Sequence, residues 1–481
     1  MAQANRELGL EGELSEEDLP KSRSELIYGL TDKPPVAESL FVALQHVLAA
    51  FVGIITPPLL ICSSLGLDPV NTSYIISMSL FASGICTFIQ CKKIGPVGSG
   101  LLSLQGTSFA FLGPIIGVGT FALNGGRTPE QALALIFGVC FFGSAIEIIL
   151  SRFLHLMSKI ITPVVSGTVV MIIGLGLIKT GVTSMAGGVA AQKAGTFGSV
   201  QNLALSGFVL LLVVVLTVSG NRFLRMGAIA IGLAAGYIIS IFLGIVDFSA
   251  LSSLPFIRLP IPFRYGMSFD FTAFLPFILL YVLTAIETVG DLTATSAVSG
   301  EPVKGALYVR RIKGGVLGDG VNSALAAVLN TFPNTTFSQN NGVIQMTGVG
   351  SRYVGFYVAG IFALLGLVPI VGGIFQALPQ PVLGGATTVM FGSIAVAGLN
   401  IVSSVHLDRR SMIIVAVSLA MGLGVLYAPE IFDDKPAIIK NLFGSSISTG
   451  GLTAILLSWL LPGGHSSSQS AAAETEVEAE V

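Results

Sequence analysis

The sequence predicts an all-α polytopic membrane protein whose chain crosses the bilayer fourteen times. Three observations carry this prediction: the apolar composition, the number of long apolar segments and the placement of the basic residues. Of the 481 residues, 52% are hydrophobic and only 10% are charged, whereas soluble domains carry about 25% charged residues. This composition excludes an ordinary soluble enzyme, because a soluble fold of this size needs far more polar surface.

The charged residues concentrate at the two ends of the chain. Residues 1–33 hold 12 of the 50 Asp, Glu, Lys and Arg residues, and residues 474–480 hold four more. We therefore expect a mobile cytoplasmic N-terminal tail over residues 1–35 and a disordered C-terminal tail over residues 463–481. The acidic start is unlike a signal peptide, and no basic patch with interleaved aromatic residues indicates a nucleic-acid partner. The four cysteines lack metal-ligand spacing, so we expect neither a metal nor another cofactor.

Fourteen segments are long and apolar enough to be spans. About 20 residues cross the hydrocarbon core of a bilayer, and eleven uninterrupted segments meet that length: 38–64, 73–91, 129–151, 155–180, 202–220, 226–246, 270–297, 353–374, 382–402, 410–428 and 446–462. Three more are apolar but interrupted by polar residues: 99–122, 314–330 and 335–350. In chain order these are spans 1 to 14.

The basic residues support this count. With the N-terminus inside, the connection after each even-numbered span is cytoplasmic, and all six such connections are basic, as the positive-inside rule requires. Their cations are Lys92, Lys93, Arg152, Lys159, Arg222, Arg225, Lys304, Arg310, Arg311, Lys313, Arg352, Arg409 and Arg410. A missed span would invert everything after it. Both termini are therefore predicted to be cytoplasmic.

A faint repeat relates the two halves of the chain. Pro163-Val-Val-Ser-Gly167 followed by Gly174 matches Pro381-Val-Leu-Gly-Gly385 followed by Gly392, 218 residues later. The two matches lie in spans 5 and 12, seven apart, and an odd number of spans per repeat predicts a seven-plus-seven inverted repeat. Alone, the match is also consistent with chance. The interrupted spans 3 and 10 lie at equivalent places, which points to a binding site near the bilayer midplane.

Four acidic residues fall inside predicted spans, where each costs at least about 2.5–3.5 kcal/mol. Glu147 lies near a predicted cytoplasmic helix end, and we expect its side chain to reach the interface beside Arg152 in a structural role. Glu287 and Asp291 stand four residues apart and therefore share a helix face. Two carboxylates so placed in low dielectric do not ionise together easily, which suits proton coupling. The alternative is a structural pair bonded to neighbouring hydroxyls.

Asp319 and His46 are the remaining ionisable residues of interest. Asp319 lies among the glycines of Gly314-Gly-Val-Leu-Gly-Asp-Gly320, which allow close backbone approach. We expect it to organise neighbouring polar groups, although proton transfer is an alternative role. His46 lies in span 1. A lone histidine is more often a packing residue than a ligand, and we interpret it so.

The interrupted spans carry the residues that suit a planar polar ligand. Span 10 reads Thr335-Thr-Phe-Ser-Gln-Asn-Asn-Gly-Val-Ile-Gln-Met-Thr347, and its extended start must lie against protein rather than lipid. Gln339 and Asn340 then fall where strand turns into helix, and their amides offer a donor and an acceptor together, as the edge of an oxo-purine or oxo-pyrimidine requires. In span 3, Phe109 can stack on a flat base, although simple packing is the alternative.

At these residues the chain closely resembles the nucleobase–ascorbate transporters, over roughly residues 24–465. Gln339-Asn-Asn-Gly342 with Thr347-Gly348 fits the signature of that family in span 10. The resemblance implies fourteen spans in a seven-plus-seven inverted repeat, with short antiparallel strands in spans 3 and 10, and a homodimer. It also implies a core domain (36–152 and 268–374) and a gate domain (153–248 and 379–462).

The resemblance also assigns roles to individual residues. Glu287 would accept hydrogen bonds from the ring N–H groups of the base, Gln339 would read another edge, and Phe109 would stack on it. Backbone groups near Ser338 and between Gly106 and Ser108 would complete the site.

The other candidate positions act around this site. Asp319, Asn340 and His46 fall on positions that hold the core together or tune it, and Asp291 falls on one that affects transport.

The stretches Gly98–Phe109 and Gln339–Tyr353 look most like bacterial xanthine permeases. The resemblance therefore implies a proton-coupled symporter in the inner membrane that imports xanthine, with urate as a further candidate substrate. Ser108 stands where some of those permeases have Asn, at a position linked to choosing between xanthine and urate. Gln339 stands where uracil permeases carry Glu, which disfavours uracil.

Three alternatives stay open at this point. The first is a permease for uracil or another base. The second is an inorganic-anion exchanger of the same architecture, which would need cationic groups or bare helix N-termini at the midplane; a carboxylate at Glu287 would repel its substrate. The third is a membrane enzyme, for which the sequence offers no nucleophile–base pair or metal cluster.

Overall fold

The computed structural model is mostly helical, with one two-stranded sheet among the residues that it describes. These residues are 26–154, 162–221, 224–225, 227–249, 251, 254–403, 405, 407–432, 434–436, 439 and 443–461. The predicted C-terminal tail, the first 25 residues and the loop cations Lys159 and Arg222 lie outside them. Internal contacts divide the chain into unit 1 (Met1–Leu154 and Leu177–Ser393) and unit 2 (His155–Gly176 and Ile394–Val481).

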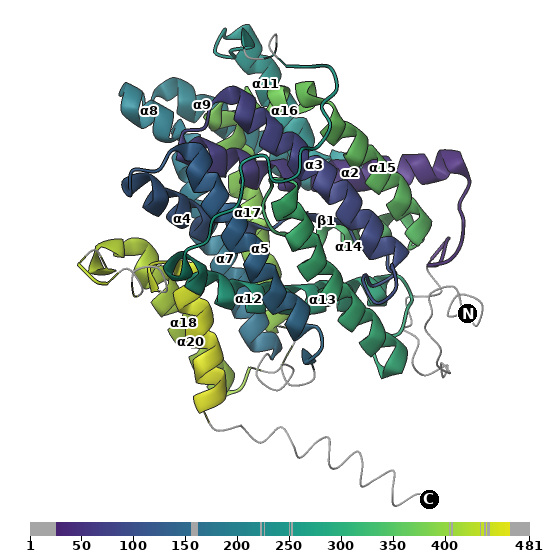
Figure 1. Cartoon of the computed structure of the whole chain (residues 1–481). Coiled ribbons are helices and arrows are strands. Elements are labelled where there is room, and N and C mark those ends of the chain that lie inside the picture. The colour runs from purple at the N-terminus through teal and green to yellow at the C-terminus, as the bar shows by residue number, and fades with distance from the viewer. Residues whose placement is uncertain are drawn as a thin grey trace, which may run out of the picture. The chain divides into compact units, whose positions relative to one another are not determined.

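Unit 1 contains most of the described helices and both strands; Figure 1 labels many of these helices and strand β1. Its helices are α2 (Val36–Leu65), α3 (Pro69–Lys92), η3 (Phe109–Phe111), α4 (Leu112–Asn124), α5 (Pro129–Leu150), α8 (Gly188–Ala194), α9 (Val200–Thr217), α11 (Ala228–Phe242), α12 (Phe271–Val298), α13 (Gly305–Val328), α14 (Gln339–Thr347), α15 (Arg352–Leu367) and α16 (Pro369–Gln376). Helix α3 packs along α15, and α5 packs against α12 and α13.

Among the residues that the structure describes, four α-helices contribute to unit 2. Helices α7 (Pro163–Met185) and α17 (Gln380–Ser403) begin or end in unit 1, whereas α18 (Arg409–Tyr427) and α20 (Ser446–Leu460) lie wholly within unit 2, with the short η5 (Pro429–Phe432) after α18. Helices α18 and α20 pack side by side (Figure 1). Glycine allows close approach within this unit, because a Cβ on Gly167 would lie 2.7 Å from the carbonyl oxygen of Gly398.

Side-chain caps begin several of these helices where the sequence changes from loop to apolar segment. The Asp68 carboxylate accepts hydrogen bonds from the backbone N–H groups of Val70 (2.9 Å) and Asn71 (3.0 Å). Thr128 and Gln131 form a reciprocal capping box at the start of α5. These caps satisfy N–H groups that the first turn of a helix leaves without an internal partner.

Each of the fourteen predicted segments contains a helix, but the helices differ in length. Eight described helices are long and apolar enough to span a membrane, and α15 with α16 makes a ninth, bent by 76°. Pro369 begins α16, and a proline both lacks an N–H group and disfavours helix at the residue before it. The chain is therefore a multi-pass membrane protein, while the count of fourteen crossings and the inverted repeat stay predictions.

The predicted short strands are present in the interrupted segments. β1 (Gln105–Thr107) and β2 (Asn334–Thr336) are antiparallel, with Gln105 opposite Thr336 and Thr107 opposite Asn334. Backbone pairing continues on both sides, since Ser108 N donates to Pro333 O (2.8 Å) and Phe337 N to Leu104 O (3.0 Å). Polar backbone groups at membrane depth need partners inside the protein, and each strand supplies those of the other.

The sheet lies tightly against α2 because two glycines meet one aromatic ring. A Cβ on Gly53 of α2 would lie 2.5 Å from Cε1 of Phe337, and a Cβ on Gly106 of β1 would collide with the same ring and lie 2.7 Å from Ile54 Cγ1. The Phe337 side chain is 7% exposed. Its ring therefore fills the space that the absent side chains of both glycines leave.

The last part of the predicted N-terminal tail, residues 27–30, pairs with the backbone at the end of α14. Tyr28 N donates to Gly348 O (3.1 Å), and Gly350 N donates back to Tyr28 O (2.9 Å). Residues 27–30 thus run beside the end of α14 instead of forming part of a mobile tail. A sequence of polar residues before the first span does not reveal this pairing, because its partner lies about 320 residues away in the chain.

The predicted core and gate domains do not coincide with the two units. Unit 2 falls within the segments that were predicted to form the gate domain, except for the tail at its end. Helices α9 and α11, also predicted for the gate domain, lie in unit 1. The two units reflect how closely the segments pack, and not which segments move during transport. The functional division into core and gate therefore stays a prediction.

Replacing Gly106 with Ala should destabilise the protein, because the new methyl group overlaps the Phe337 ring. We expect the free energy of unfolding to fall by about 1–3 kcal/mol, as for other overpacked cores. Thermal unfolding of the purified protein in detergent measures this. Gly113→Ala is the matched control, since nothing lies within 4 Å of a Cβ at that position. Equal melting temperatures for the two variants would contradict the packing described above.

Candidate functional site

The candidate site lies where the two strands turn into helices. β1 leads through Ser108 into η3 and α4, and β2 leads through Ser338 into α14. Because the strands are antiparallel, the two helices leave the sheet in opposite directions, separated by only three paired residues on each strand. Two helix N-termini thus meet in the interior of unit 1; at the start of α14, Asn340 N and Asn341 N already donate to Phe337 O and Ser338 O.

Helix α12 brings the two neighbouring carboxylates to this place. It packs against β2, α14 and η3, and Asp291 accepts a hydrogen bond from the Thr336 hydroxyl (2.9 Å). Glu287 lies one turn earlier on α12 and interacts electrostatically with Asp291 and Asp319. The predicted helix face therefore exists, and it is turned toward the second strand.

Ser338, Gln339 and Glu287 keep their polar groups available. Ser338 and Gln339 are exposed and Glu287 is half-buried. Among the residues that the structure describes, the side chains of Glu287 and Gln339 make no hydrogen bond within the protein. The Glu287 carboxylate can therefore accept hydrogen bonds from a ligand, and the Gln339 amide can both donate and accept them.

Asp319 is the centre of the buried polar network beside the site. It is fully buried on α13 and accepts hydrogen bonds from the hydroxyls of Thr288 on α12 and Thr335 on β2 (3.4 Å). The side-chain amide of Gln90 on α3 is a third donor, at 3.4 Å. One carboxylate thus connects three helices with the second strand, which is the organising geometry that the glycine-rich sequence around Asp319 favours.

Three amides extend this network, and only one of them was singled out from the sequence. Asn340 donates to Leu102 O (2.5 Å) and so fixes the chain that leads into β1. Gln90 donates to Gly315 O (3.1 Å) and accepts from Ser99 N (3.0 Å). Asn322 donates to the side-chain oxygen of Gln105 (3.3 Å).

The sequence did contain a signal for the missed residues. Gln90 is an amide inside an otherwise apolar span, and Asn322 follows the glycine-rich segment around Asp319. A polar residue in such a position needs a partner inside the protein.

Phe109 and Ser108 lie at the end of β1. Phe109 is 8% exposed, and its ring meets Phe391 edge to face with centroids 5.6 Å apart. Ser108 is buried, and its hydroxyl has no hydrogen-bond partner among the described residues. The strand therefore ends in an aromatic ring and a hydroxyl that can still bond to a ligand.

His46 is buried in α2, as a packing residue would be. Neither of its ring nitrogens has a hydrogen-bond partner in the described part of the chain. The structure therefore places it in the core without the hydrogen bond that a packing histidine usually makes.

The interpretation of Glu147 as an interfacial charge beside Arg152 is wrong. Its side chain is 1% exposed, and neither of its carboxylate oxygens has a hydrogen-bond partner among the described residues, so Arg152 does not pair with it. Its electrostatic neighbours are Asp319 and Glu287.

Close helix packing explains this burial. A Cβ on Gly320 of α13 would lie 2.8 Å from the backbone nitrogen of Ile148, and a Cβ on Gly143 would collide with the ring of Tyr281. Helix α5 therefore lies directly against α12 and α13, and the side chain of Glu147 lies between helices instead of reaching the surface.

Removing the acceptor at Asp319 should destabilise the strand and helix junction. Asp319→Ala leaves three buried donors without this acceptor, at a cost of about 1–3 kcal/mol for each donor that finds no other one. Asp319→Asn keeps one acceptor oxygen and should lose less. Thermal unfolding in detergent compares them with Asp247→Ala, which removes an exposed aspartate. An unchanged melting temperature for Asp319→Ala would show that the network does not hold the site.

Comparison with known proteins identifies the family of the chain. A family model described as "Permease family" matches residues 37–431. The chain is 51% identical to xanthine permease XanP of Escherichia coli (strain K12) over 454 residues, covering 94% of this chain and 98% of that protein. It is 47% identical to xanthine permease XanQ of the same organism, covering 93% and 96%.

A solved structure supports the fold independently of sequence. Murine Slc26a9, an anion transporter in its inward-facing state, aligns with a TM-score of 0.56 and 13% identity, covering 90% of this chain and 69% of that one. At this identity the likeness concerns the fold alone. The family model and the two xanthine permeases show that the chain belongs to the permease family of nucleobase–ascorbate transporters.

Proposed function

We propose that this protein is a proton-coupled symporter that imports xanthine, with urate as a second substrate. The single observation that carries the proposal is the set of uncommitted polar groups at the strand ends. Glu287, Ser338 and Gln339 offer acceptors and donors there, and Phe109 lies at the end of the facing strand. The relatives named xanthine permeases, at 51% and 47% identity, support xanthine as the base.

Each residue then has a role that its chemistry allows. The Glu287 carboxylate accepts hydrogen bonds from ring N–H groups of the purine, and the Gln339 amide pairs with an edge that presents a carbonyl beside an N–H. Phe109 stacks on the flat ring. Backbone N–H groups at the starts of η3 and α14 bind the exocyclic oxygens.

Proton coupling follows from the carboxylates around the bound base. Glu287 interacts with Asp291 and Asp319, and three acids gathered in low dielectric are not all ionised together. A proton that arrives with the substrate relieves this repulsion. Transport then proceeds by movement of the core domain against the gate domain in a homodimer of the inner membrane, with both termini cytoplasmic.

Two other functions fit the structure less well. Uracil is smaller, and Gln339 replaces the Glu that uracil permeases carry at this position. An anion exchanger would share the fold of Slc26a9, but the carboxylates of Glu287 and Asp291 beside β2 would repel an inorganic anion.

Replacing Glu287 with Gln should abolish coupled transport while keeping the size of the side chain. Hydrogen bonds to a charged group contribute about 1.5–3 kcal/mol, so we expect at least a tenfold loss of xanthine affinity, at about 1.4 kcal/mol per factor of ten. The measurement is uptake of labelled xanthine into cells that lack their own purine permeases, with and without an uncoupler and over a range of external pH.

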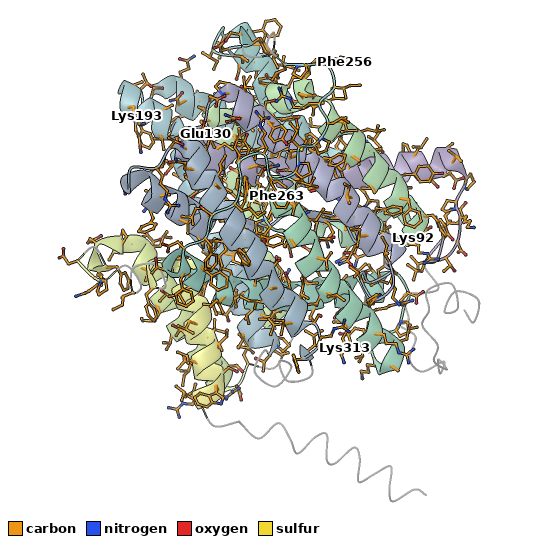
Figure 2. All side chains as sticks on the ribbon, in the orientation of Figure 1. Lys92, Glu130, Lys193, Phe256, Phe263 and Lys313 are labelled. Atoms are coloured by element: carbon orange, nitrogen blue, oxygen red, sulfur yellow. The ribbon has the colours of Figure 1, made fainter. Side chains whose placement is uncertain are left out.

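Glu130→Gln is the matched control, because Glu130 is an exposed carboxylate at the start of α5, away from the strands (Figure 2). Unmodified protein and control should take up xanthine faster at lower external pH and lose uptake with the uncoupler. Normal pH-dependent uptake by Glu287→Gln would contradict the proposed role of Glu287 in substrate binding and proton coupling.

A further inference from the structure

Glu147 on α5 is a buried carboxyl group to which the proposed function gives no role. Its side chain is 1% exposed, and it lies where α5 packs against α12 and α13. Neither carboxylate oxygen has a hydrogen-bond partner within the part of the chain that the structure describes. Burying an ionised carboxylate without a hydrogen bond or an opposite charge is very costly, so such a group takes up a proton instead.

The hydroxyl groups around Glu147 already donate elsewhere. Beside it on α12, Thr284 and Tyr281 donate to backbone carbonyl oxygens at 3.2 and 2.7 Å. On α5, Ser144 and Ser151 donate to carbonyl oxygens of their own helix at 2.7 and 2.6 Å. A hydroxyl has one proton to donate but can still accept. The oxygen of Thr284 can therefore pair with Glu147 only when Glu147 carries a proton.

The charges that act on Glu147 are negative. They belong to Asp319 on α13 and Glu287 on α12, and a like charge disfavours the ionised form of a carboxyl group. The third helix that packs against α5 is α4, and its residues Leu112–Asn124 include no ionisable side chain. On α5 itself, the buried Cys140 is the other ionisable group within two turns of Glu147.

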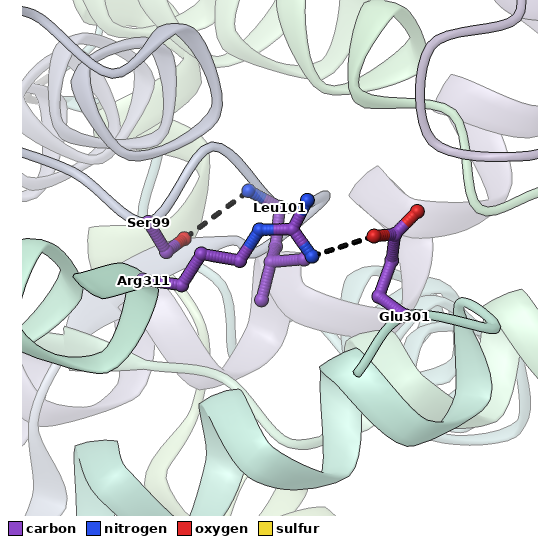
Figure 3. Close-up of polar contacts among 4 residues, drawn as sticks. All are labelled: Ser99, Leu101, Glu301 and Arg311. Carbon is purple, nitrogen blue, oxygen red and sulfur yellow. Dashed lines mark hydrogen bonds and ion pairs between the residues drawn. The ribbon is translucent and has the colours of Figure 1, made fainter. Parts of the chain in front are cut away.

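The protein stabilises a different carboxylate with a cation. At the start of α13, Arg311 donates to Glu301 at 2.6 Å (Figure 3). Other cations gather near the ends of α5 and α13, where they line a pocket with Ser151: Arg152, Arg310 and Lys313. None of these groups donates a hydrogen bond to Glu147 in the described structure.

The other acids near the strand ends have donors or face the base. Asp319 accepts three hydrogen bonds, and Asp291 accepts one from Thr336 (2.9 Å). Hydrogen bonds to an ionised carboxylate favour that form. In the proposed function, Glu287 accepts hydrogen bonds from the ring N–H groups of the base and must then be ionised as well. Glu147 is thus the one acid of these four to which no described donor turns.

We propose that Glu147 holds the cotransported proton while the base is bound, a role that rests on the proposed function above. The proton arrives on the half-buried Glu287 and passes on to Glu147, so that an O–H bond breaks at Glu287 and one forms at Glu147. Glu287 is left ionised and accepts the N–H groups of the base. One acid thus binds the base, while another keeps the proton.

The test separates binding and exchange from proton-driven accumulation. The variant is Glu147→Gln, which is neutral and close in size to the protonated acid. Glu130→Gln makes the same change at an exposed position of the same helix, and Glu147→Asp keeps a carboxyl group. In proteoliposomes, we measure exchange of labelled for unlabelled xanthine without a gradient, and accumulation driven by an imposed pH gradient. In weakly buffered detergent, an indicator dye reports the proton taken up when xanthine binds.

With one proton per base, a gradient of one pH unit sustains about tenfold accumulation. The unmodified protein and Glu130→Gln should reach it, and Glu147→Asp should recover part of it. Glu147→Gln should bind xanthine with unchanged affinity and exchange it, because its side chain imitates the protonated acid. It should neither accumulate xanthine nor take up a proton on binding, because it has no proton to exchange.

Accumulation by Glu147→Gln equal to that of Glu130→Gln overturns the proposal. Loss of binding and exchange together with accumulation also overturns it, since that pattern assigns Glu147 a structural role. If the unmodified protein itself shows no accumulation in a pH gradient, the proposed function is contradicted, and this proposal with it.

Discussion

The structure depends on a constraint that the bilayer imposes on two short strands. Backbone N–H and C=O groups at membrane depth must be bonded within the protein, and an interrupted span breaks the helical bonding that normally achieves this. β1 and β2 solve the problem for each other, through the pairing of Gln105–Thr107 with Asn334–Thr336. Only because these strands are paired can two helices begin in the interior and present their N-termini and first side chains to a ligand.

The surrounding packing keeps this pair in one position. Gly53 and Gly106 allow the Phe337 ring to lie between α2 and the sheet, and Asp319 connects α12, α13, β2 and α3 through its donors. Such a network specifies the arrangement only when its members are satisfied. The side chains proposed to bind the ligand differ in this respect, since Glu287 and Gln339 make no hydrogen bonds within the described part of the protein. The site therefore combines a fixed frame with uncommitted polar groups.

Much of this was predictable, because the bilayer makes polar residues conspicuous. The polar run from Thr335 to Thr347 predicts an interruption, and the four-residue spacing of Glu287 and Asp291 predicts their shared face. Glu147 was misinterpreted because its position along the helix was visible but the close approach of Gly320 to Ile148 was not. Long-range partners were equally hidden from the sequence, as in the pairing of Tyr28 with Gly348.

The most direct test of the account is whether xanthine occupies the junction of β2 and α14. The four native cysteines are all buried, so a single cysteine at the exposed Ser338 can be labelled selectively with a maleimide, and one at the exposed loop residue Thr196 serves as reference. The account predicts that xanthine slows labelling of Ser338→Cys in the purified protein but not of Thr196→Cys. Labelling of Ser338→Cys at the same rate with saturating xanthine, in a variant that still binds it, would contradict the account.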